Sequence, residues 1–187
     1  MNAHLSAKTT ILIAAALALC CTARGVRPGD RAEPGQTVAF ARASVEGMRA
    51  SKLLICEAER VAAGRAVPVA EVALKSGTGT YATFLEPGRY AVPGVMRAEQ
   101  LDRPLEAERG TLVFDLEAGA SNYIGSYWPL TESGRQIAVD LGGGKAFYAA
   151  RAAFEKRFFG LARRFPVRDA LKTAELLTIQ QAEDDSR

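Results

Sequence analysis

Histidine and cysteine are scarce in this 187-residue chain, which has one histidine and three cysteines. His4, Cys20 and Cys21 all lie within a segment, residues 1–23, that has the features of an export signal. Once that segment is removed or lipidated, the folded part keeps no histidine and one thiol, Cys56. Ser-His-Asp triads, Cys-His pairs and most zinc sites need an imidazole. The composition therefore excludes these classes of enzyme, and we expect no cofactor and no metal site.

The chain also lacks a hydrophobic run of the roughly 20 residues that a transmembrane helix needs. Its N-terminal apolar run, from Ile11 to Leu19 and preceded by Lys8, has instead the length of a signal-peptide core. We therefore predict no transmembrane helix, and we assign residues 1–23 to a signal peptide.

The end of the apolar run resembles a bacterial lipobox. Residues 17–20 read Leu-Ala-Leu-Cys, and in a lipobox a cysteine that follows a small residue is diacylated and becomes the new N-terminus. Leu19 is bulkier than the pattern prefers, and moving the frame to Cys21 puts Cys20 before it. The resemblance implies lipid on Cys20 or on Cys21 and a protein anchored on the periplasmic side of a membrane in the bacterial cell envelope. An ordinary cleavage after Ala23, which would release a soluble periplasmic or secreted protein, is the alternative.

Neither sign of charge dominates the chain. The formal net charge is +3 and the basic residues are dispersed. An excess of basic residues can indicate nucleic-acid binding, but exported proteins seldom meet nucleic acid, and the sequence has no recognition motif. We expect no nucleic-acid partner.

Residues 24–35 contain few apolar side chains, and Pro28, Gly29, Asp30 and Pro34 are all residues typical of turns and linkers. Such a composition predicts a flexible tether between the membrane and a folded domain. The rest of the chain is long enough for one domain of ordinary size with a real core.

Residues 36–142 consist of short strand-like runs separated by turn signals. In the run from Thr111 to Glu117 the residues Leu112, Phe114 and Leu116 share one face, as expected for a half-buried strand. Further runs rich in β-branched and aromatic residues are Val38 to Val45, Leu53 to Val61, Val67 to Lys75, Thr80 to Leu85, Tyr90 to Met96, Tyr123 to Trp128 and Ile137 to Leu141. Many short strands at regular intervals favour a mainly β fold, an antiparallel β-sandwich.

After the glycines at 142–144 the hydrophobic period changes to that of a helix. One stripe collects the apolar residues Phe147, Ala150, Phe154, Phe158, Leu161 and Phe165. Pro166 is expected to stop this helix, and Asp169 to cap a shorter one from Ala170 toward Gln181. We therefore predict one or two C-terminal α-helices over residues 145–182, packed on the sandwich.

The aromatic stripe allows two interpretations. The phenylalanines could dock the helix on an open face of the sandwich, or a basic amphipathic helix could lie on anionic headgroups or in a groove of a partner. Residues outside the stripe remain as candidates for contact with a partner or a membrane: Trp128, Phe159, Lys156 and Arg163.

Two short motifs resemble those of a known group. Glu86-Pro87-Gly88-Arg89-Tyr90 places a tyrosine after a Pro-Gly turn, and Leu116-Glu117-Ala118-Gly119 leads to Tyr123-Ile124-Gly125. From about Thr80 to Trp128 the chain resembles uncharacterised bacterial envelope lipoproteins with a β-sandwich of the transthyretin or carboxypeptidase-regulatory kind. The resemblance implies a fold and a compartment, and it carries over no catalytic residue.

Three local patterns have features of active sites. Glu57 and Glu59 would lie about 6.6 Å apart on one strand face, a spacing that a glycoside hydrolase could use, but alternating glutamates also suit a solvent face. Gly142-Gly143-Gly144-Lys145 precedes a helix without the spacing of a P-loop, which favours a hinge. Ser51-Lys52 and Lys75-Ser76 pair a hydroxyl with an amine, yet neighbours on a strand point to opposite faces.

Two classes of function follow. The sequence favours a non-enzymatic binding or structural module that contacts another envelope protein, a glycan or the membrane surface; the alternative is a carboxylate-dependent envelope glycan hydrolase. Cys56 shares its strand face with Leu54, and we predict a buried, inert thiol rather than a catalytic one.

Overall fold

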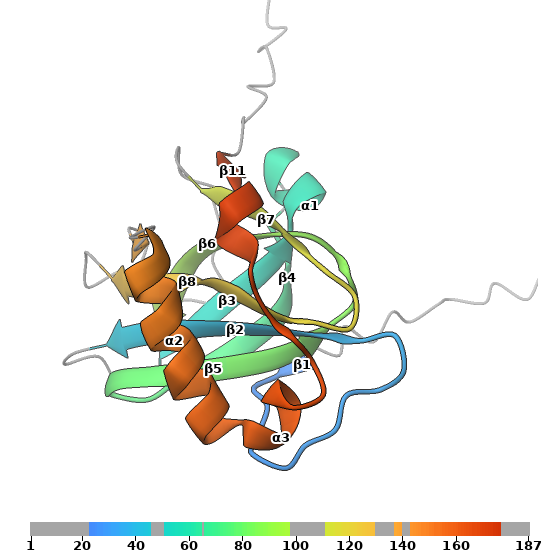
Figure 1. Cartoon of the computed structure of the whole chain (residues 1–187). Helices are drawn as coiled ribbons and strands as arrows, with labels where there is room; N and C mark the ends of the chain where they lie inside the picture. Colours follow the sequence, from blue (N-terminus) through green and yellow to red (C-terminus); the bar gives the residue numbers. More distant parts are fainter. Residues whose placement is uncertain are drawn as a thin grey trace, which may run out of the picture.

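The computed structural model describes residues 23–45, 51–64, 66–97, 111–129, 137–139 and 143–176 (Figure 1). The strands are β1 (Ala23–Arg24), β2 (Thr37–Val45), β3 (Ser51–Glu57), β4 (Pro68–Leu74), β5 (Gly77–Leu85), β6 (Gly88–Arg97), β7 (Leu112–Leu116), β8 (Ser121–Pro129), β9 (Ile137–Val139), β10 (Val167–Asp169) and β11 (Glu175–Leu176). The helices are α1 (Ala58–Ala62), α2 (Gly143–Arg157) and α3 (Phe159–Ala162), followed by the 3₁₀ turn η2 (Ala170–Thr173). Among these residues, no helix has both the length and the apolar character needed to cross a bilayer.

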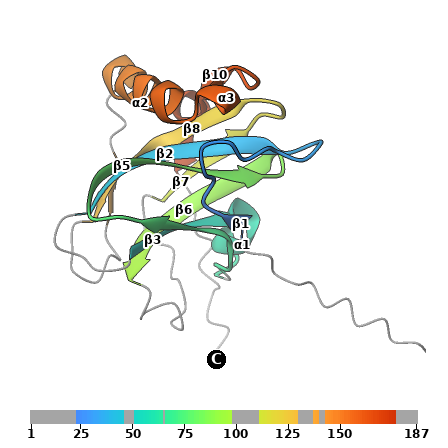
Figure 2. The ribbon, with the colours of Figure 1, turned by 90° about the horizontal axis from the view of Figure 1, so that it is seen from below.

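The described strands form two sheets that stack face to face (Figure 2). Sheet A has the order β1-β4-β3-β6-β7-β11, and sheet B has the order β10-β8-β2-β5, with β9 paired to β8. The mainly β class is confirmed, and most of the described strand pairs are antiparallel as expected, but three pairs are parallel. β2 pairs with β8 in parallel, as do β10 with β8 and β1 with β4. Hydrophobic alternation shows which face of a strand is buried, but it does not show in which direction a distant partner runs.

The main core lies between the two sheets. β2 contributes Ala39, Ala41, Ala43 and Val45 to it, and each is about 1% exposed. The opposite face of β2 is buried too, because Val38 and Phe40 contact the residues of α2. β2 is therefore covered on both sides.

Helix α2 covers the outer face of sheet B (Figure 2). Of the stripe predicted from the sequence, Phe147, Ala150, Phe154, Phe158 and Leu161 are all buried. The ring of Phe154 stacks on that of Phe40 with centroids 4.2 Å apart. These aromatic residues dock the helix on the sheet, as the first of the two interpretations predicts.

The C-terminal segment is less helical than the spacing predicts. Phe158 leaves the helical region with φ −118° and ψ 44°, so α2 ends at Arg157 and a separate short helix, α3, follows. Asp169 caps the next turn as predicted, because its carboxylate accepts the N–H of Leu171 at 3.2 Å. That turn is a single 3₁₀ turn followed by β11, and the predicted continuation over residues 177–181 lies outside the described residues.

A small helix covers part of the outer face of sheet A. The sequence predicts a strand through Val61, but β3 ends at Glu57 and α1 begins at Ala58. Glu57 and Arg60 form an ion pair of 2.5 Å across the first turn. The cluster beneath α1 consists of Cys56, Ala58, Val61, Ala91 and Val113, with Ala66 at its margin. The side chain of Val113 points to the face of β7 opposite that of Leu112 and Phe114, and it is buried because α1 covers that face.

The segment after residue 22 joins the two sheets at one edge of the sandwich. Ala23 and Arg24 pair in parallel with β4, and the N–H of Val26 then donates to the carbonyl of Ala82 on β5 at 2.7 Å. Val26 is 8% exposed and packs among the residues under α2. The predicted flexible tether over residues 24–35 is therefore wrong for its first residues. Its composition is polar, but the hydrogen bonds available at a sheet edge do not depend on side-chain composition.

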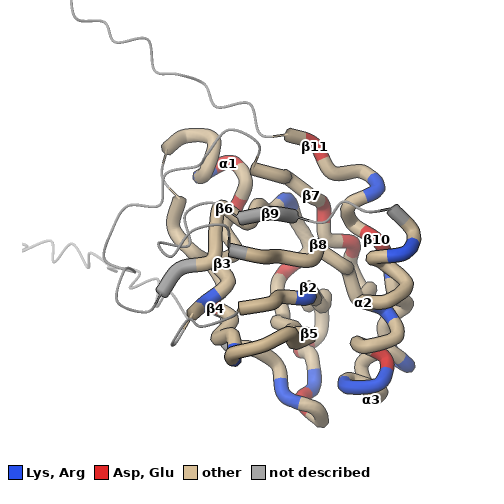
Figure 3. Tube along the Cα trace, turned by 90° about the vertical axis from the view of Figure 1, so that its left-hand side faces the viewer, with Lys and Arg blue, Asp and Glu red and all other residues tan. Residues whose placement is uncertain are grey.

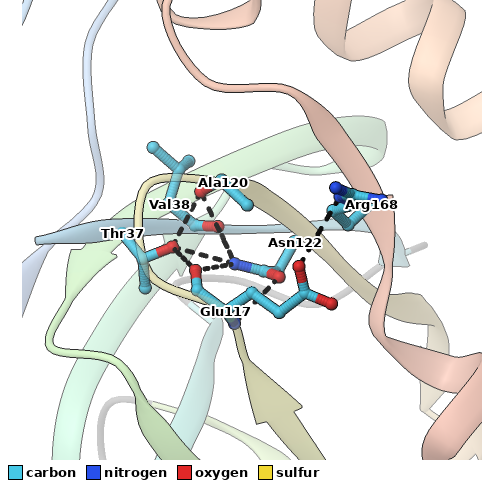
Figure 4. Close-up of polar contacts among 6 residues, drawn as sticks. All are labelled: Thr37, Val38, Glu117, Ala120, Asn122 and Arg168. Carbon is cyan, nitrogen blue, oxygen red and sulfur yellow. Dashed lines mark hydrogen bonds and ion pairs between the residues drawn. The ribbon is translucent and has the colours of Figure 1, made fainter.

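Asn122, at the start of β8, ties the β7–β8 turn to the first residue of β2 (Figure 4). Its amide nitrogen donates to Thr37 Oγ1 at 2.9 Å and to the carbonyl of Glu117 at 3.2 Å. Its Oδ1 accepts the N–H of Glu117 at 3.2 Å. Thr37 and Asn122 are at most 1% exposed, and each satisfies polar groups of the turn that would otherwise be buried without a partner. The cluster has a structural role.

The Pro-Gly-Arg-Tyr motif has a local physical explanation. The hydroxyl of Tyr90 donates to the carbonyl of Glu86, four residues earlier, at 2.9 Å. The tyrosine thereby closes the turn between β5 and β6, in the manner of the tyrosine corners of other sandwiches.

Candidate functional site

A cleft of about 870 Å³ opens beside the segment that joins the two sheets. We call it the cationic cleft. It is lined by Gly25, Val26, Arg27, Pro28, Lys52, Glu71, Val72, Ala73, Lys75, Tyr81, Ala82, Arg157 and Phe158. These residues come from the N-terminal segment, from β3, β4 and β5, and from the end of α2. Its volume lies within the range of about 300–1,000 Å³ that is typical of small-molecule sites.

Four cationic side chains and one carboxylate line this cleft. Lys52 and Glu71 pair with each other at 2.5 Å, so their charges largely cancel. No carboxylate in the described part of the chain forms an ion pair with the side chain of Arg27, Lys75 or Arg157. Figure 3 shows basic positions near β4 and in the segment that carries α3. The cleft therefore has a net positive charge, which favours an anionic ligand.

Aromatic rings position the guanidinium of Arg157. It lies 5.9 Å from the ring centroid of Tyr81 and 5.3 Å from that of Phe158. Both distances are within the roughly 6 Å of a cation–π contact. The two rings restrict the guanidinium, and its N–H groups remain the donors that a bound anion would use.

Tyr81 is held by backbone groups as well as by packing. Its hydroxyl accepts the N–H of Lys75 at 2.9 Å and donates to the carbonyl of the same residue at 3.2 Å. A Cβ atom at Gly79 would lie 2.6 Å from the tyrosine hydroxyl oxygen, a distance that excludes a side chain there. Glycine at this position allows the ring to lie across the strand, where it supports both Lys75 and Arg157.

The structure separates the partner-contact candidates predicted from the sequence. Phe159 is 63% exposed on α3, and the guanidinium of Arg163 lies 5.5 Å from its ring centroid. Trp128 is 39% exposed on β8. Lys156 is exposed on α2, next in sequence to Arg157. Of these four candidates, only Phe159 and Arg163 contact each other.

In the structure, the residues of the three catalytic patterns do not form the arrangements that the sequence suggests. Glu57 ends a strand and Glu59 belongs to α1, so the pair cannot share a strand face. Lys52 pairs with Glu71, whereas Ser51 is 1% exposed. Lys145 is exposed near the start of α2, and Gly142 lies outside the described residues. Within the described ranges, no three residues of the His, Cys, Asp and Glu types gather into a group that could hold a metal.

A smaller hollow of about 270 Å³ lies between α1 and β11 and brings two acids together. Glu59 and Glu175 both line it, with Arg89. Glu175 forms an ion pair with Arg89, and both glutamates are exposed. The environment therefore gives neither glutamate the apolar pocket that makes a carboxyl group a general acid.

Cys56 is fully buried, which confirms the prediction of an inward thiol. Its cover is α1, however, rather than the second sheet. Burial raises the pKa of the thiol from 9.0 to about 12, and the negative charge of Glu57 adds to the shift. A thiol with so high a pKa forms almost no thiolate near neutral pH, so Cys56 is unsuited to nucleophilic catalysis.

Sequence analysis did not identify the cationic cleft. Its unpaired cations are separated by tens of residues and belong to no local motif. In the sequence, Lys52 and Lys75 stand out only beside their serine neighbours, Ser51 and Ser76. Two features of the sequence could have indicated the cleft: Gly79 two residues before Tyr81, and the basic residues at the end of α2. Neither feature is specific to a binding site.

Comparisons with protein-family models, with curated proteins and with solved structures found no match to this chain.

Proposed function

We propose that this chain is an exported, lipid-anchored protein of the bacterial cell envelope that acts as a non-enzymatic binding module. The observation that carries the proposal is the position of β1. Ala23 pairs with Ala70 and Arg24 with Glu71, so an ordinary cleavage after Ala23 would cut within this strand. Processing at Cys20 or Cys21 keeps the strand complete. The lipobox-like sequence and the pairing of β1 thus both favour processing at Cys20 or Cys21 over cleavage after Ala23.

The same position would hold the domain close to the membrane. Cys20 is three residues before Ala23, and three residues of fully extended chain span at most about 11 Å. Because β1 is part of sheet A, no long tether would intervene between the lipid and the folded domain. A partner on or in the same membrane, such as another envelope protein, a glycan or the lipid surface itself, is the kind that such an anchor favours.

The test is the mature product of the full chain expressed in a bacterial host. We expect its intact mass to show a lipidated N-terminal cysteine and the protein to fractionate with membranes. Replacing the lipidated cysteine, by Cys20→Ser or Cys21→Ser, should release the protein from the membrane or leave it unprocessed, and the other of the two variants is the matched control that should leave fractionation unchanged. A water-soluble product that begins at Arg24 would refute the proposal.

A carboxylate-dependent glycan hydrolase is the second candidate, and one observation favours it: Glu59 and Glu175 line the same hollow. If the hollow is an active site, the purified protein should hydrolyse envelope glycan, and Glu59→Gln or Glu175→Gln should abolish the activity. A wild-type protein that releases no reducing ends under conditions in which a known hydrolase does so would exclude this candidate. The ion pair of Glu175 with Arg89 makes that the result we expect.

A further inference from the structure

The cationic cleft contains more positive charge than its own residues balance. Lys52 has a partner in Glu71, but Arg27, Lys75 and Arg157 line the same concave space and form no ion pair with any carboxylate of the described ranges. Like charges gathered in a hollow raise the local potential and attract counter-ions more strongly than charges dispersed on a convex surface. We infer that the cationic cleft is a binding site for a phosphate ester.

The donors suit phosphate because they come from separate elements that line the same cleft. Arg27 belongs to the N-terminal segment, Lys75 to the connection between β4 and β5, and Arg157 to the end of α2. A phosphate group presents several charged oxygens around one centre, and can accept hydrogen bonds from donors on separate elements at once. A guanidinium binds two of these oxygens with its fork, while an ammonium acts as a compact point charge.

One of these donors, Arg157, is positioned in advance, and the backbone that carries Lys75 is fixed. The rings of Tyr81 and Phe158 hold the guanidinium of Arg157, and the hydroxyl of Tyr81 fixes the backbone of Lys75 on both its N–H and its carbonyl. Donors that are already ordered lose less conformational entropy when a ligand binds. Tyr81 therefore serves as a positioning residue for Arg157, and it fixes the backbone from which the Lys75 side chain extends.

The apolar part of the lining indicates what accompanies the phosphate. Val26, Pro28, Val72, Ala82 and Phe158 present hydrocarbon surface beside the cations. A ligand that joins a phosphate to a carbon skeleton would contact both kinds of surface. A phospholipid headgroup with the first part of its acyl chains and a soluble sugar or glycerol phosphate share this chemistry.

Arg157 also has a role that needs no ligand. It lies in the last turn of α2, where a cation stabilises the partial negative charge of the helix end. The test must therefore separate loss of binding from loss of stability. Arg151 supplies the control for this residue, because it lies on the same helix, carries the same charge and forms only an exposed ion pair with Glu155. Lys172, which is exposed on η2, is the matched control for Lys75.

The experiment is isothermal titration calorimetry of the full chain, processed by its bacterial host and purified in a neutral detergent. One arm titrates glycerol 3-phosphate in solution, and the other titrates phosphatidylglycerol carried in detergent micelles. We expect saturable binding in at least one arm that weakens with added salt. If both probes bind, a soluble phosphate ester is sufficient for binding. If only phosphatidylglycerol binds, the ligand is a phospholipid headgroup together with part of its acyl chains.

Arg157→Gln and Lys75→Gln should each weaken binding about tenfold or more, as expected for loss of a charge-assisted hydrogen bond. Arg151→Gln and Lys172→Gln should change it less than about twofold. Circular dichroism checks that each variant is folded. No saturable heat with either probe up to millimolar concentration, or equal losses in the cleft and control variants, would overturn the inference. Lipidation is read separately from the mass of the mature protein, so failure of the anchor and failure of the site are distinguishable.

Discussion

The outer faces of the two sheets are covered by helices of very different size. On sheet B, the 15-residue helix α2 packs Phe154 against Phe40 and Phe147 against Tyr123. On sheet A, the five-residue helix α1 covers a small patch with Ala58 and Val61. The large cover, α2, depends on bulky side chains at regular spacing along the sequence. The small cover, α1, depends on small side chains close to the end of β3. The first kind is readable from sequence and the second is not.

The largest expected effect is at the centre of the large cover. Phe154→Ala removes a fully buried ring that stacks on Phe40 with centroids 4.2 Å apart, and should lower the free energy of unfolding by about 3–5 kcal/mol. Urea denaturation of the purified full chain measures it. Tyr148→Ala, on the exposed side of the same helix at 65% exposure, is the control and should cost less than about 1 kcal/mol. Similar losses in both variants would mean that α2 is not docked through its phenylalanines.

The small cover should matter less, but measurably. Val61 is 1% exposed beneath α1, and Val61→Ala should cost about 2 kcal/mol because two methyl groups leave a packed cluster. Ala63→Ser, at the exposed end of the same helix, should change stability by less than about 0.5 kcal/mol. A loss at Val61 as large as that at Phe154 would contradict the difference between the two covers.

The thiol beneath the small cover gives a chemical test. The raised pKa of Cys56 predicts that a thiol reagent labels the native protein slowly at neutral pH and labels the denatured protein at once. The sign of the pH effect on stability follows from the same shift. The unfolded thiol ionises near pH 9 and the folded one near pH 12, so the contribution of Cys56 to stability is intact below pH 9 and is lost as the pH rises toward 12.

Cys56→Ala is the control for that loss. If Cys56 causes it, the variant should show a smaller fall in stability between pH 9 and pH 12 than the wild type. Rapid labelling of the native protein would show instead that α1 opens readily.

The smallest effect is expected on the exposed side of α3. Phe159 is 63% exposed and contacts Arg163, so Phe159→Ala should change the free energy of unfolding by less than about 0.5 kcal/mol. Thermal melting of the purified chain would show it. A marked loss of melting temperature would place Phe159 in the core and remove it from the candidates for partner contact.

The comparison of the covers also explains which parts of the fold the sequence could predict. The period of the phenylalanines predicts the face of α2, and the alternation of Leu112, Phe114 and Leu116 predicts the inner face of β7. The end of β3 at Glu57 could not be predicted, because the residues that follow it fit either a longer strand or a short helix. The parallel pairing of β2 with β8 was also out of reach, since register between distant strands depends on the whole sheet.

The candidate site was harder to predict than the fold. A core residue contributes to a periodic pattern along its own element, but Arg27, Lys75 and Arg157 become neighbours only after the sheets have stacked. Tyr81 illustrates the difficulty, because its packing and its bonds to Lys75 are both determined by the tertiary structure. Sequence patterns identified these residues as ordinary surface or strand positions.

The crossing of the N-terminal segment between the sheets has a mechanical consequence. Under the lipid-anchor proposal, tension on the anchor would load the hydrogen bonds of β1 to β4 and then the bond from Val26 to Ala82. Arg27 and Pro28, which follow directly, form one wall of the cationic cleft. A pulling force that breaks these bonds would therefore displace that wall before it reached the sandwich core, so the proposed anchor and the proposed binding site would be coupled through a few residues.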